Sequence, residues 1–385
     1  MKHRVNVLGV GVTQFSLPDA APDVVVLASE ASRLALADAG ISHEQVRSAY
    51  AGFAGGNLQR GCGVQGMELI DMPGASAMTL GCATAAFSLG RQVIELGSAD
   101  CVLVIGVEAL EANAKELDSA FASRLPALSK AQTMGNEPLA LQVLAGAARE
   151  YIGRHGASRE SFARVALKAH QHASRNPQAL HAQQIALDDV LASEALIDPL
   201  TRLQSSQPAN GAAAVVLCSD AFLSKLDASR PVRIVAQAIG RDPFGSTGDS
   251  FTWAAGHELN ATTARQAYEQ AGIGPDEIDV CELDDTTSAS ELLAYEALGF
   301  CPEGGAGKFI EDGDNTYGGA VVINPSGGAL ASGNARGAMP LVQCAELVRQ
   351  LRGSAGQRQV EGARIALQQS LGLTGAHMVT IYQCD

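Results

Sequence analysis

Apolar and polar residues follow two different periods along this chain, one typical of buried strands and one typical of amphipathic helices. The segment Val5 to Phe15, VNVLGVGVTQF, is a nearly continuous apolar run and predicts a buried strand. Residues Val24 to Gly40 repeat apolar positions at helical spacing and end in glycine, which predicts a helix with a glycine C-cap. The next residues, ISHEQVRSAYAGF, predict a loop and another strand. The N-terminal part therefore alternates strands and helices, as α/β proteins do.

The same order of elements recurs in the C-terminal part. Val232 to Gly240 predicts a strand, Asn260 to Gly272 predicts a helix that again ends in Ala-Gly, and IGPDEIDVCELDD leads into a strand. Asn334 to Gly353 then predicts a helix followed by the strands RIALQQSL and AHMVTIYQC, and it matches the helix and strand between Thr79 and Glu108. A strand-helix unit that is repeated indicates duplication at the level of the fold. We therefore expect two related halves, each a sheet covered by helices.

The segment between the halves is helical and more polar, and we interpret it as an inserted domain. Within it, Lys168, His170 and His172 stand at helical i, i+2, i+4 spacing. Because no other metal-binding residues accompany them, a solvated helix face is the favoured interpretation over a ligand set. The predicted organisation is a first N-terminal part, a helical loop domain, a return strand and a C-terminal half, at residues 1–109, 110–203, 204–230 and 231–385.

Cys82 stands where a small-residue turn passes into the first of the two matching helices. At a helix entrance, unpaired N–H groups and the positive end of the helix dipole favour a thiolate, which is the nucleophilic form. The alternative is that Cys82 is a small buried residue, as most intracellular cysteines are. The pseudo-twofold relation would bring Cys82 and Asn334, each predicted at a helix entrance, towards a shared centre. Position alone leaves both interpretations of Cys82 open.

Composition and charge exclude some classes of partner and indicate the cellular compartment. The chain has 385 residues, 46% hydrophobic content and a formal net charge of −14. Such a chain has no basic stripe, so we expect neither nucleic acid nor an anionic membrane surface as a partner. No apolar run reaches the roughly 20 residues that span a bilayer, and the start lacks a signal segment, so we expect a cytoplasmic protein. Its eight cysteines include no C-x-x-C pair, which favours neither disulfides nor a metal site.

Several long motifs resemble one known family, the thiolase superfamily, and within it the thiolases of the sterol-carrier-protein-x type. The similarity extends nearly from end to end and is carried by GCAT around Cys82, ADCVLVIGVE, NGAAAVVLCSDAF from Asn210, ELLAYEALGFCPEG from Glu291, GDNTYGG from Gly313, INPSGG from Ile323 and CAELVRQLRG from Cys344. The resemblance implies an α/β thiolase fold with duplicated halves in five layers, αβαβα, and a helical loop domain. It also implies a homodimer or tetramer and a pocket for a coenzyme A thioester, with no permanently bound cofactor.

The resemblance makes Cys82 the residue that takes the acyl group as a covalent thioester. The family's histidine in a G-H-P motif is replaced here by Asn334, and the H-D-C-F motif reads D-D-T-T. Asp284 thus stands where the second histidine is expected, Asp285 matches the family acid, and Thr286 replaces a cysteine. Asparagine can donate to an oxyanion but cannot take a proton, so Asp284 is the remaining candidate base. The alternative, that Asp284 merely caps a turn, is equally open.

Two further groups of residues have weaker signals. Ser326, Gly327 and Gly328 of NPSGG could cradle an anionic part of coenzyme A or the acyl group, although close backbone packing explains such glycines equally well. His257 has no assignable partner and is interpreted as a structural histidine.

The sequence therefore predicts a thiolase-like acyltransferase with altered acid/base residues. One alternative is an aldolase-type lyase that cleaves side-chain coenzyme A thioesters with a small partner subunit and forms no acyl-Cys82. A second is a non-catalytic subunit that binds acyl-CoA. Because no sterol-carrier domain follows in this chain, we expect no fused lipid carrier.

Overall fold

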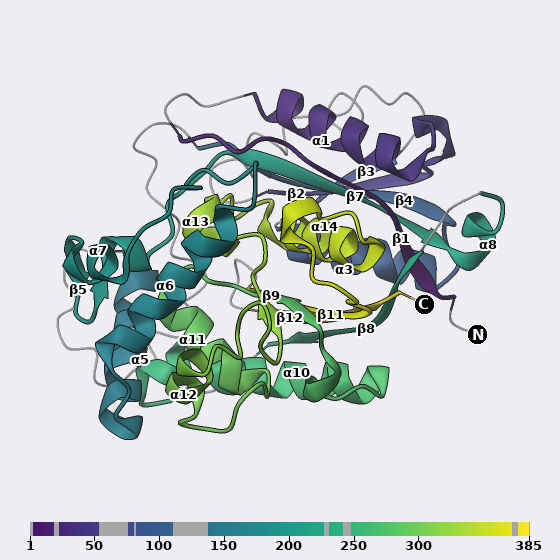
Figure 1. Ribbon diagram of the computed structural model, residues 1–385. Helices are drawn as coiled ribbons and strands as arrows, with labels where there is room; N and C mark the ends of the chain where they lie inside the picture. Colours follow the sequence, from purple (N-terminus) through teal and green to yellow (C-terminus); the bar gives the residue numbers. More distant parts are fainter. Residues whose placement is uncertain are drawn as a thin grey trace.

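The computed structural model describes residues 3–18, 23–53, 76–80, 82–110, 138–226, 231–241, 248–371 and 376–384. In Figure 1 these residues form five layers, with helices outside, between and beneath two halves of a sheet. The upper half contains β1 (Val5–Val12), β2 (Ser48–Phe53), β3 (Ser76–Leu80), β4 (Cys101–Glu108) and β7 (Gly211–Ser219). The lower half contains β8 (Val232–Gly240), β9 (Val280–Glu282), β10 (Val322–Ile323), β11 (Ile365–Leu371) and β12 (His377–Gln383).

Helices separate and cover these half-sheets (Figure 1). The outer helix of the upper half is α1 (Val24–Ala39), and α3 (Ala83–Glu95) and α14 (Met339–Arg352) lie between the halves. The lower face carries α10 (His257–Ala271), α11 (Ser288–Ala297) and α12 (Ala306–Glu311). Shorter or peripheral elements are α5 (Leu139–His155), α6 (Arg159–Ala173), α7 (Leu187–Ala192), β5 (Ala195–Ile197), β6 (Leu200–Thr201), α8 (Asp220–Leu223), α9 (Phe251–Ala254) and α13 (Gly328–Ser332).

The order of the strands confirms the duplication. Among the described strands the upper half runs β1-β7-β4-β2-β3 and the lower half runs β8-β12-β11-β9-β10, so each strand has a counterpart. The halves join through a short antiparallel pair in which Val5 faces Ile234 and Val7 faces Val232. The matching helices α3 and α14 pack against each other in the middle layer. The predicted αβαβα arrangement is therefore present.

Local signals set the ends of several helices. Helix α1 begins at the N-cap Asp23, whose side chain accepts from Val25 N, and ends at Gly40 with φ 65°. Helix α10 likewise ends at Gly272 with φ 68°. Because residues with a Cβ rarely adopt positive φ, these glycines end the helices at the predicted residues.

The predicted helix start at Asn334 is wrong, because α14 begins at Met339. The backbone of Asn334 is instead extended beside residues 207–209, with Asn334 N donating to Gln207 O over 2.8 Å and Ala209 N donating to Asn334 O over 3.1 Å. A residue that forms such a ladder cannot also take helical backbone angles. Asn334 is thereby fixed to the N-terminal half of the chain.

The predicted solvated face at Lys168, His170 and His172 is also wrong, because all three side chains are buried in α6. Lys168 Nζ donates to the Glu291 carboxylate and to Ile323 O. His172 lies 2.9 Å from Asn324 O and 2.8 Å from Thr316 Oγ1, and burial lowers its pKa to about 3. Lys168 and His172 are accommodated because partners distant in sequence satisfy them.

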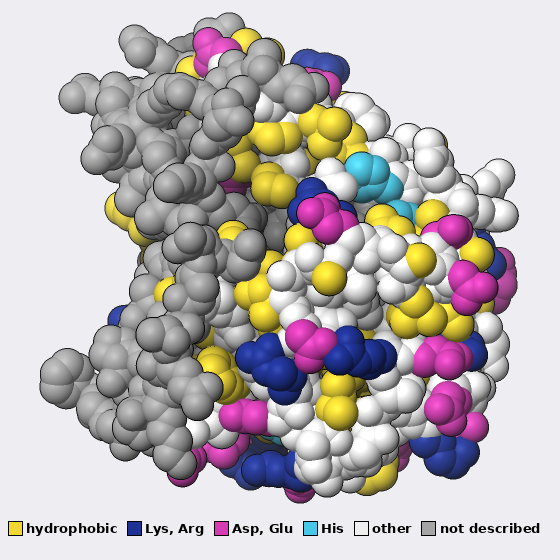
Figure 2. All heavy atoms as spheres, turned by 90° about the vertical axis from the view of Figure 1, so that its left-hand side faces the viewer, with side chains coloured by type: hydrophobic (Ala, Val, Ile, Leu, Met, Phe, Trp, Pro, Cys, Tyr) yellow, Lys and Arg dark blue, Asp and Glu magenta, His cyan; other side chains and the backbone are white. Residues whose placement is uncertain are grey.

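The surface over α5 to α7 is seen in Figure 2, where Lys and Arg side chains are interspersed with Asp and Glu on the described part of this face. Ion pairs such as Arg159 with Asp198 and Arg164 with Glu160 explain part of this mixing. No helix among the described residues is long and apolar enough to cross a membrane.

Candidate active site

Cys82 is the N-cap residue of α3, with extended backbone angles of φ −165° and ψ 158°. It is a free, partly exposed thiol, and its carbonyl accepts the first helical bond from Ala86 N at 3.1 Å. The predicted position at a helix entrance is therefore confirmed. The unpaired N–H groups of the first turn lie beside this residue, which favours negative charge there.

Gly52 of β2 lies directly against the turn that carries Cys82. A Cβ at position 52 would stand 2.3 Å from Ala83 N and 2.4 Å from the Cys82 carbonyl carbon, closer than atoms can approach. Only glycine lets the strand lie so near the start of α3. Strand β2 thus determines where the thiol lies.

Gly52→Ala is expected to displace this turn and to lower the free energy of unfolding by about 1–3 kcal/mol, the usual cost of overpacking. The rate at which iodoacetamide alkylates Cys82 should change in parallel, and both are measured by thermal unfolding and peptide mass spectrometry. Gly153→Ala is the matched control, because a Cβ there meets nothing within 4 Å. The control should be neutral or stabilising, since alanine is the better helix former. Equal behaviour of the two variants would contradict the role of Gly52.

Three of the predicted site residues meet in one pocket, here called the nucleophile pocket. Cys82, Asp284 and Asn334 line it together, although they come from three separate parts of the chain. The cavity measures about 470 Å³ up to its open mouth. Its other lining residues are Ala83, Thr84, Arg336, Met339, Pro340, Gln343, Ser370 and Leu371.

Asp284 follows β9, and hydrogen bonds hold both its backbone and its side chain. Its backbone N–H donates to Gln369 Oε1 over 2.9 Å, and its Oδ1 accepts from Thr286 N over 3.3 Å. Burial raises the pKa of Asp284, while the Arg336 guanidinium and the hydrogen bond from Thr286 act in the opposite direction. A carboxyl whose pKa is raised by burial is suited to exchange protons. The hydrogen bond from Thr286 N is the contact that a turn cap would make. Asp284 nevertheless also lines the nucleophile pocket.

Asn334 and Arg336 provide hydrogen-bond donors in the nucleophile pocket. Asn334 is 3% exposed, and its Nδ2 donates to Ser206 Oγ over 3.0 Å, which fixes the orientation of the amide. Arg336 was not singled out from the sequence, although an arginine within the mainly small and apolar stretch GNARGAMPLV could have drawn attention. Both residue types can stabilise an oxyanion.

Asp285, predicted to be catalytic, lines none of the described pockets that involve Cys82 or Asp284. Its carboxylate oxygens accept from Ala329 N at 2.7 Å and Leu330 N at 3.2 Å, so it caps the start of α13. Burial and the neighbouring Glu291 carboxylate raise the pKa of Asp285. These contacts favour a structural role, and its catalytic role stays a prediction.

The glycine segment at Ser326, Gly327 and Gly328 packs tightly against the core. A Cβ at Gly327 would stand 2.6 Å from the Cβ of Ala173, and one at Gly328 would stand 1.9 Å from Asp285 Oδ2. Ser326 and Gly328 line a separate cavity of about 440 Å³ that shares Met339 with the nucleophile pocket. Close packing therefore accounts for the glycines, and their contact with coenzyme A stays a prediction.

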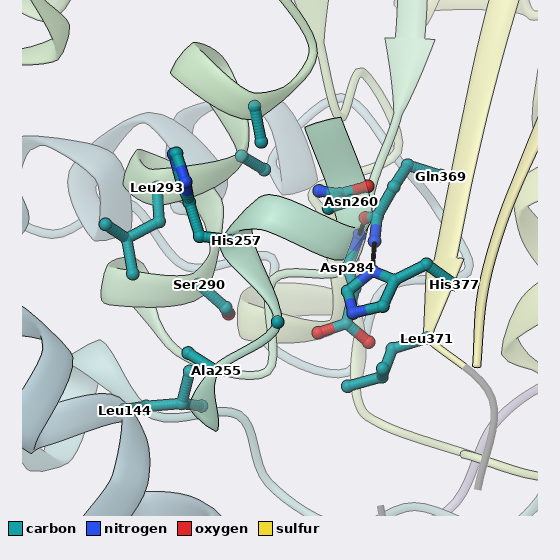
Figure 3. A pocket seen from close by; sticks show the side chains of 13 residues that line it. Leu144, Ala255, His257, Asn260, Asp284, Ser290, Leu293, Gln369, Leu371 and His377 are labelled. Carbon is teal, nitrogen blue, oxygen red and sulfur yellow. Dashed lines mark hydrogen bonds between the residues drawn. The ribbon is translucent and has the colours of Figure 1, made fainter. Parts of the chain in front are cut away.

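A further cavity, here called the histidine pocket, adjoins the nucleophile pocket. It measures about 430 Å³ and is seen from close by in Figure 3. The two pockets share Asp284 and Leu371. His257 lies on its wall with a pKa that burial lowers, and His377, at the start of β12, lies across the pocket. Sequence reasoning missed His377, whose only signal was a histidine preceding an apolar strand. No cluster of metal-binding side chains occurs among the residues that the structure describes.

Comparison with known proteins gives matches to both halves of the chain. The family model for the N-terminal domain of thiolase matches residues 19–221, and the model described as thiolase C-terminal domain-like matches residues 254–383. Sterol carrier protein 2 of Homo sapiens is 40% identical over 396 residues, covering 99% of this chain and 72% of the relative. The benzoylsuccinyl-CoA thiolase subunit BbsB of Thauera aromatica is 32% identical over 369 residues, covering 94% and 92%.

Among solved structures, the Ltp2-ChsH2(DUF35) aldolase superposes with a TM-score of 0.83 at 24% identity. The superposition covers all of this chain and 98% of that one. At this identity the likeness concerns the fold.

Proposed function

Because the chain belongs to the thiolase family, we propose that it transfers an acyl group from a coenzyme A thioester through a covalent thioester on Cys82. Family members act on coenzyme A thioesters, as the name of the benzoylsuccinyl-CoA thiolase subunit indicates. The observation that carries the proposal is the meeting of Cys82, Asp284 and Asn334 in one pocket. Coenzyme A enters as part of the substrate, and no permanently bound cofactor is proposed.

The first half of the reaction forms the acyl-enzyme. The Cys82 thiol gives its proton to the Asp284 carboxylate, and Sγ attacks the thioester carbonyl carbon. The carbonyl oxygen becomes an oxyanion, for which Asn334 and Arg336 are the donors in the pocket. The carbon–sulfur bond to coenzyme A then breaks, and coenzyme A leaves as a thiol with the proton held by Asp284.

The second half returns the enzyme to its starting state. An acceptor gives its proton to Asp284, attacks the acyl carbon and displaces Cys82 as a thiolate, which then recovers the proton. One carboxyl thus acts as base and then as acid in both halves, the task that the family divides among histidine and cysteine. The raised pKa of Asp284 supports this dual use, since it lies nearer the working pH than that of an ordinary aspartate.

An aldolase-type reaction is the second candidate, favoured by the replacement of both motif histidines by Asp284 and Asn334. The structural neighbour described as an aldolase is a complex with a DUF35 partner, so this candidate includes a small partner subunit. Carbon–carbon cleavage of that kind leaves Cys82 unacylated. A homodimer or tetramer, and a non-catalytic acyl-CoA-binding role, stay predictions.

Intact-mass measurement tests the main proposal. The purified protein is incubated with acyl-CoA thioesters of several chain lengths, and binding is measured in parallel by calorimetry. We expect a mass gain of one acyl group that maps to the peptide containing Cys82 and disappears when an acceptor is added. Binding of thioesters without an adduct at any chain length would exclude the acyl-enzyme and leave the aldolase and binding roles.

A further inference from the structure

We propose that the cavity beside α13 and α14 is a second binding site, which takes a carboxylate attached to an apolar chain and holds it through Arg349. This is the cavity of about 440 Å³ that Ser326 and Gly328 line, and it is here called the arginine cavity. It adjoins the nucleophile pocket at Met339 but contains none of the residues to which acyl transfer was assigned. The inference therefore goes beyond the proposed function.

One face of α14 forms much of this cavity. Its lining residues on the helix follow one another at intervals of three or four, which places their side chains on the same side: Met339, Val342, Glu346 and Arg349. The remaining wall comes from the end of β1, the segment after α6 and the start of α13. Part of the lining is apolar, from Val12, Phe15, Met339 and Val342. Such a volume and such a wall are typical of small-molecule sites.

Arg349 brings a positive charge to the cavity and lacks a carboxylate partner. Two other arginines near the C-terminus of α14 are each neutralised, Arg352 by Asp38 and Arg358 by Glu346. Within the described part of the chain, no ion pair of this kind includes Arg349. Burial lowers the pKa of the Arg349 guanidinium, and the nearby Glu346 carboxylate acts in the opposite direction. The charge of Arg349 is therefore partly desolvated and not paired.

The donors of Arg349 can reach a ligand in the cavity. A guanidinium has five N–H donors, and here Nη1 donates to Gln178 Oε1 over 3.4 Å, a long hydrogen bond. No nitrogen of Arg349 is among the buried atoms without a partner in the described residues, and the side chain is partly exposed. The donors that Gln178 leaves open are therefore accessible. A carboxylate suits them because its two oxygens accept from two N–H groups at once.

Glu346 lines the same cavity and limits the charge that fits. Its Oε1 accepts from Arg358 Nε over 3.1 Å and from Gln350 Nε2 over 2.9 Å, and its Oε2 accepts from Arg358 Nη2 over 2.9 Å. These bonds occupy the carboxylate, and the pair with Arg358 cancels its charge. The positive charge of Arg349 is left, which a monoanion such as a carboxylate neutralises. A phosphate dianion would add an uncompensated negative charge beside Glu346.

The carboxylate has two sources, a free carboxylic acid and the far end of an acyl group. Met339 lines both this cavity and the nucleophile pocket, so an acyl chain that starts at Cys82 would pass Met339 to enter. Arg349 follows Met339 by ten positions on α14, about 15 Å along the helix axis. An acyl group that reaches Arg349 must therefore be long and carry its carboxylate at the far end. The binding chemistry is the same for both sources, and the experiment separates them.

Calorimetry with free acids tests the first source. Octanoate should bind the parent protein about 10–100-fold more tightly than octanamide, the effect of a hydrogen bond to a charged group. It should also bind at least about tenfold more tightly than acetate, which has no chain to bury. Arg349→Gln should remove the preference for octanoate over octanamide, and Arg349→Lys should keep part of it. Arg352→Gln is the matched control and should keep the preference, because it removes the same charge from α14 outside the cavity.

Matched thioesters test the second source. In a Cys82→Ala background, which removes acylation, a long-chain acyl-CoA is compared with an acyl-CoA of the same length that ends in a carboxylate. Tighter binding of the carboxylate thioester that is lost in Arg349→Gln would assign the cavity to the acyl chain. A preference for octanoate alone would assign it to a separate carboxylic acid.

Two outcomes would overturn the inference. One is the absence of a carboxylate preference in both comparisons with unchanged Arg349, a result that needs no variant at this position to fold. The other is a preference that Arg349→Gln retains. Acylation of Cys82 in the parent protein by unsubstituted thioesters tests the proposed function separately, so either proposal can fail without the other.

Discussion

Replacement of Cys82 by alanine is expected to abolish acyl transfer, with a fall in the turnover rate of about 10³-fold or more. The reason is that Cys82 is the one thiol in the nucleophile pocket among the described residues, and no other group there can form a thioester. Steady-state release of coenzyme A and intact mass measure the loss. Binding of the thioester should persist, since the alanine leaves the rest of the pocket intact.

Cys301→Ala provides the matched control, because Cys301 is also a free and partly exposed cysteine but lies outside the nucleophile pocket. It should keep both the turnover rate and the acyl adduct. If Cys82→Ala still released coenzyme A while the adduct vanished, covalent acyl transfer through Cys82 would be wrong. Carbon–carbon cleavage would instead give a shorter acyl-CoA without release of free coenzyme A.

Replacement of Asp284 by asparagine is expected to slow acylation of the enzyme by about 10²–10⁴-fold, the usual contribution of a positioned base. Burial raises the pKa of Asp284, and a base must be ionised to act. The acylation rate of the parent protein should therefore fall as the pH drops through that raised pKa, and the variant should lack this dependence. Single-turnover kinetics across a pH series measure both effects.

Arg336→Gln provides a second test of whether Asp284 is the group that titrates. The Arg336 guanidinium lowers the pKa of Asp284, so its removal should move the acidic limb of the pH profile to higher pH. A limb that stays in place in Arg336→Gln would show that Arg336 does not act on the pKa of Asp284. If the acidic limb of the pH profile were unchanged in Asp284→Asn, a group other than Asp284 would be responsible for it.

Stability distinguishes a catalytic Asp284 from a structural one. For a carboxyl whose pKa is raised in the folded protein, the folded state binds the proton more tightly than the unfolded state does. The stabilising contribution of this carboxyl to the free energy of unfolding is therefore present at low pH. It is lost as the pH rises through the pKa of the folded state. At neutral pH the neutral asparagine should leave the free energy of unfolding unchanged or increase it. A marked loss of stability would instead support the interpretation as a turn cap.

The sequence by itself determined most of the elements, the duplication and the position of Cys82 at a helix entrance. The period of apolar residues shows which face of a helix or strand is buried, and capping residues such as Asp23 and Gly40 act on their own helix. Cys82 could be placed at a helix N-terminus for the same reason. Such signals are local, so they are readable without knowing what lies across the molecule.

The tertiary structure decided which residues share the site and which are buried. Lys168 was predicted on a solvated face because no other metal-binding residues accompany it in the sequence, but Glu291, 123 positions away, pairs with it in the core. Asn334 was predicted to begin a helix, but pairing with residues 207–209 holds it extended. Each outcome depends on a partner far away in sequence, which local periodicity cannot report.

The residues around the two pockets also depend on contacts that the local sequence pattern does not report. Arg336 and His377 carry no local pattern that marks them, and Asp284 and Gln369, whose hydrogen bond lies beside His377, are 85 positions apart. The sequence could therefore name Cys82 and the altered motif residues. Only packing of the two halves against each other decided what surrounds them, because contacts between distant segments set the charge, burial and proton positions of a site.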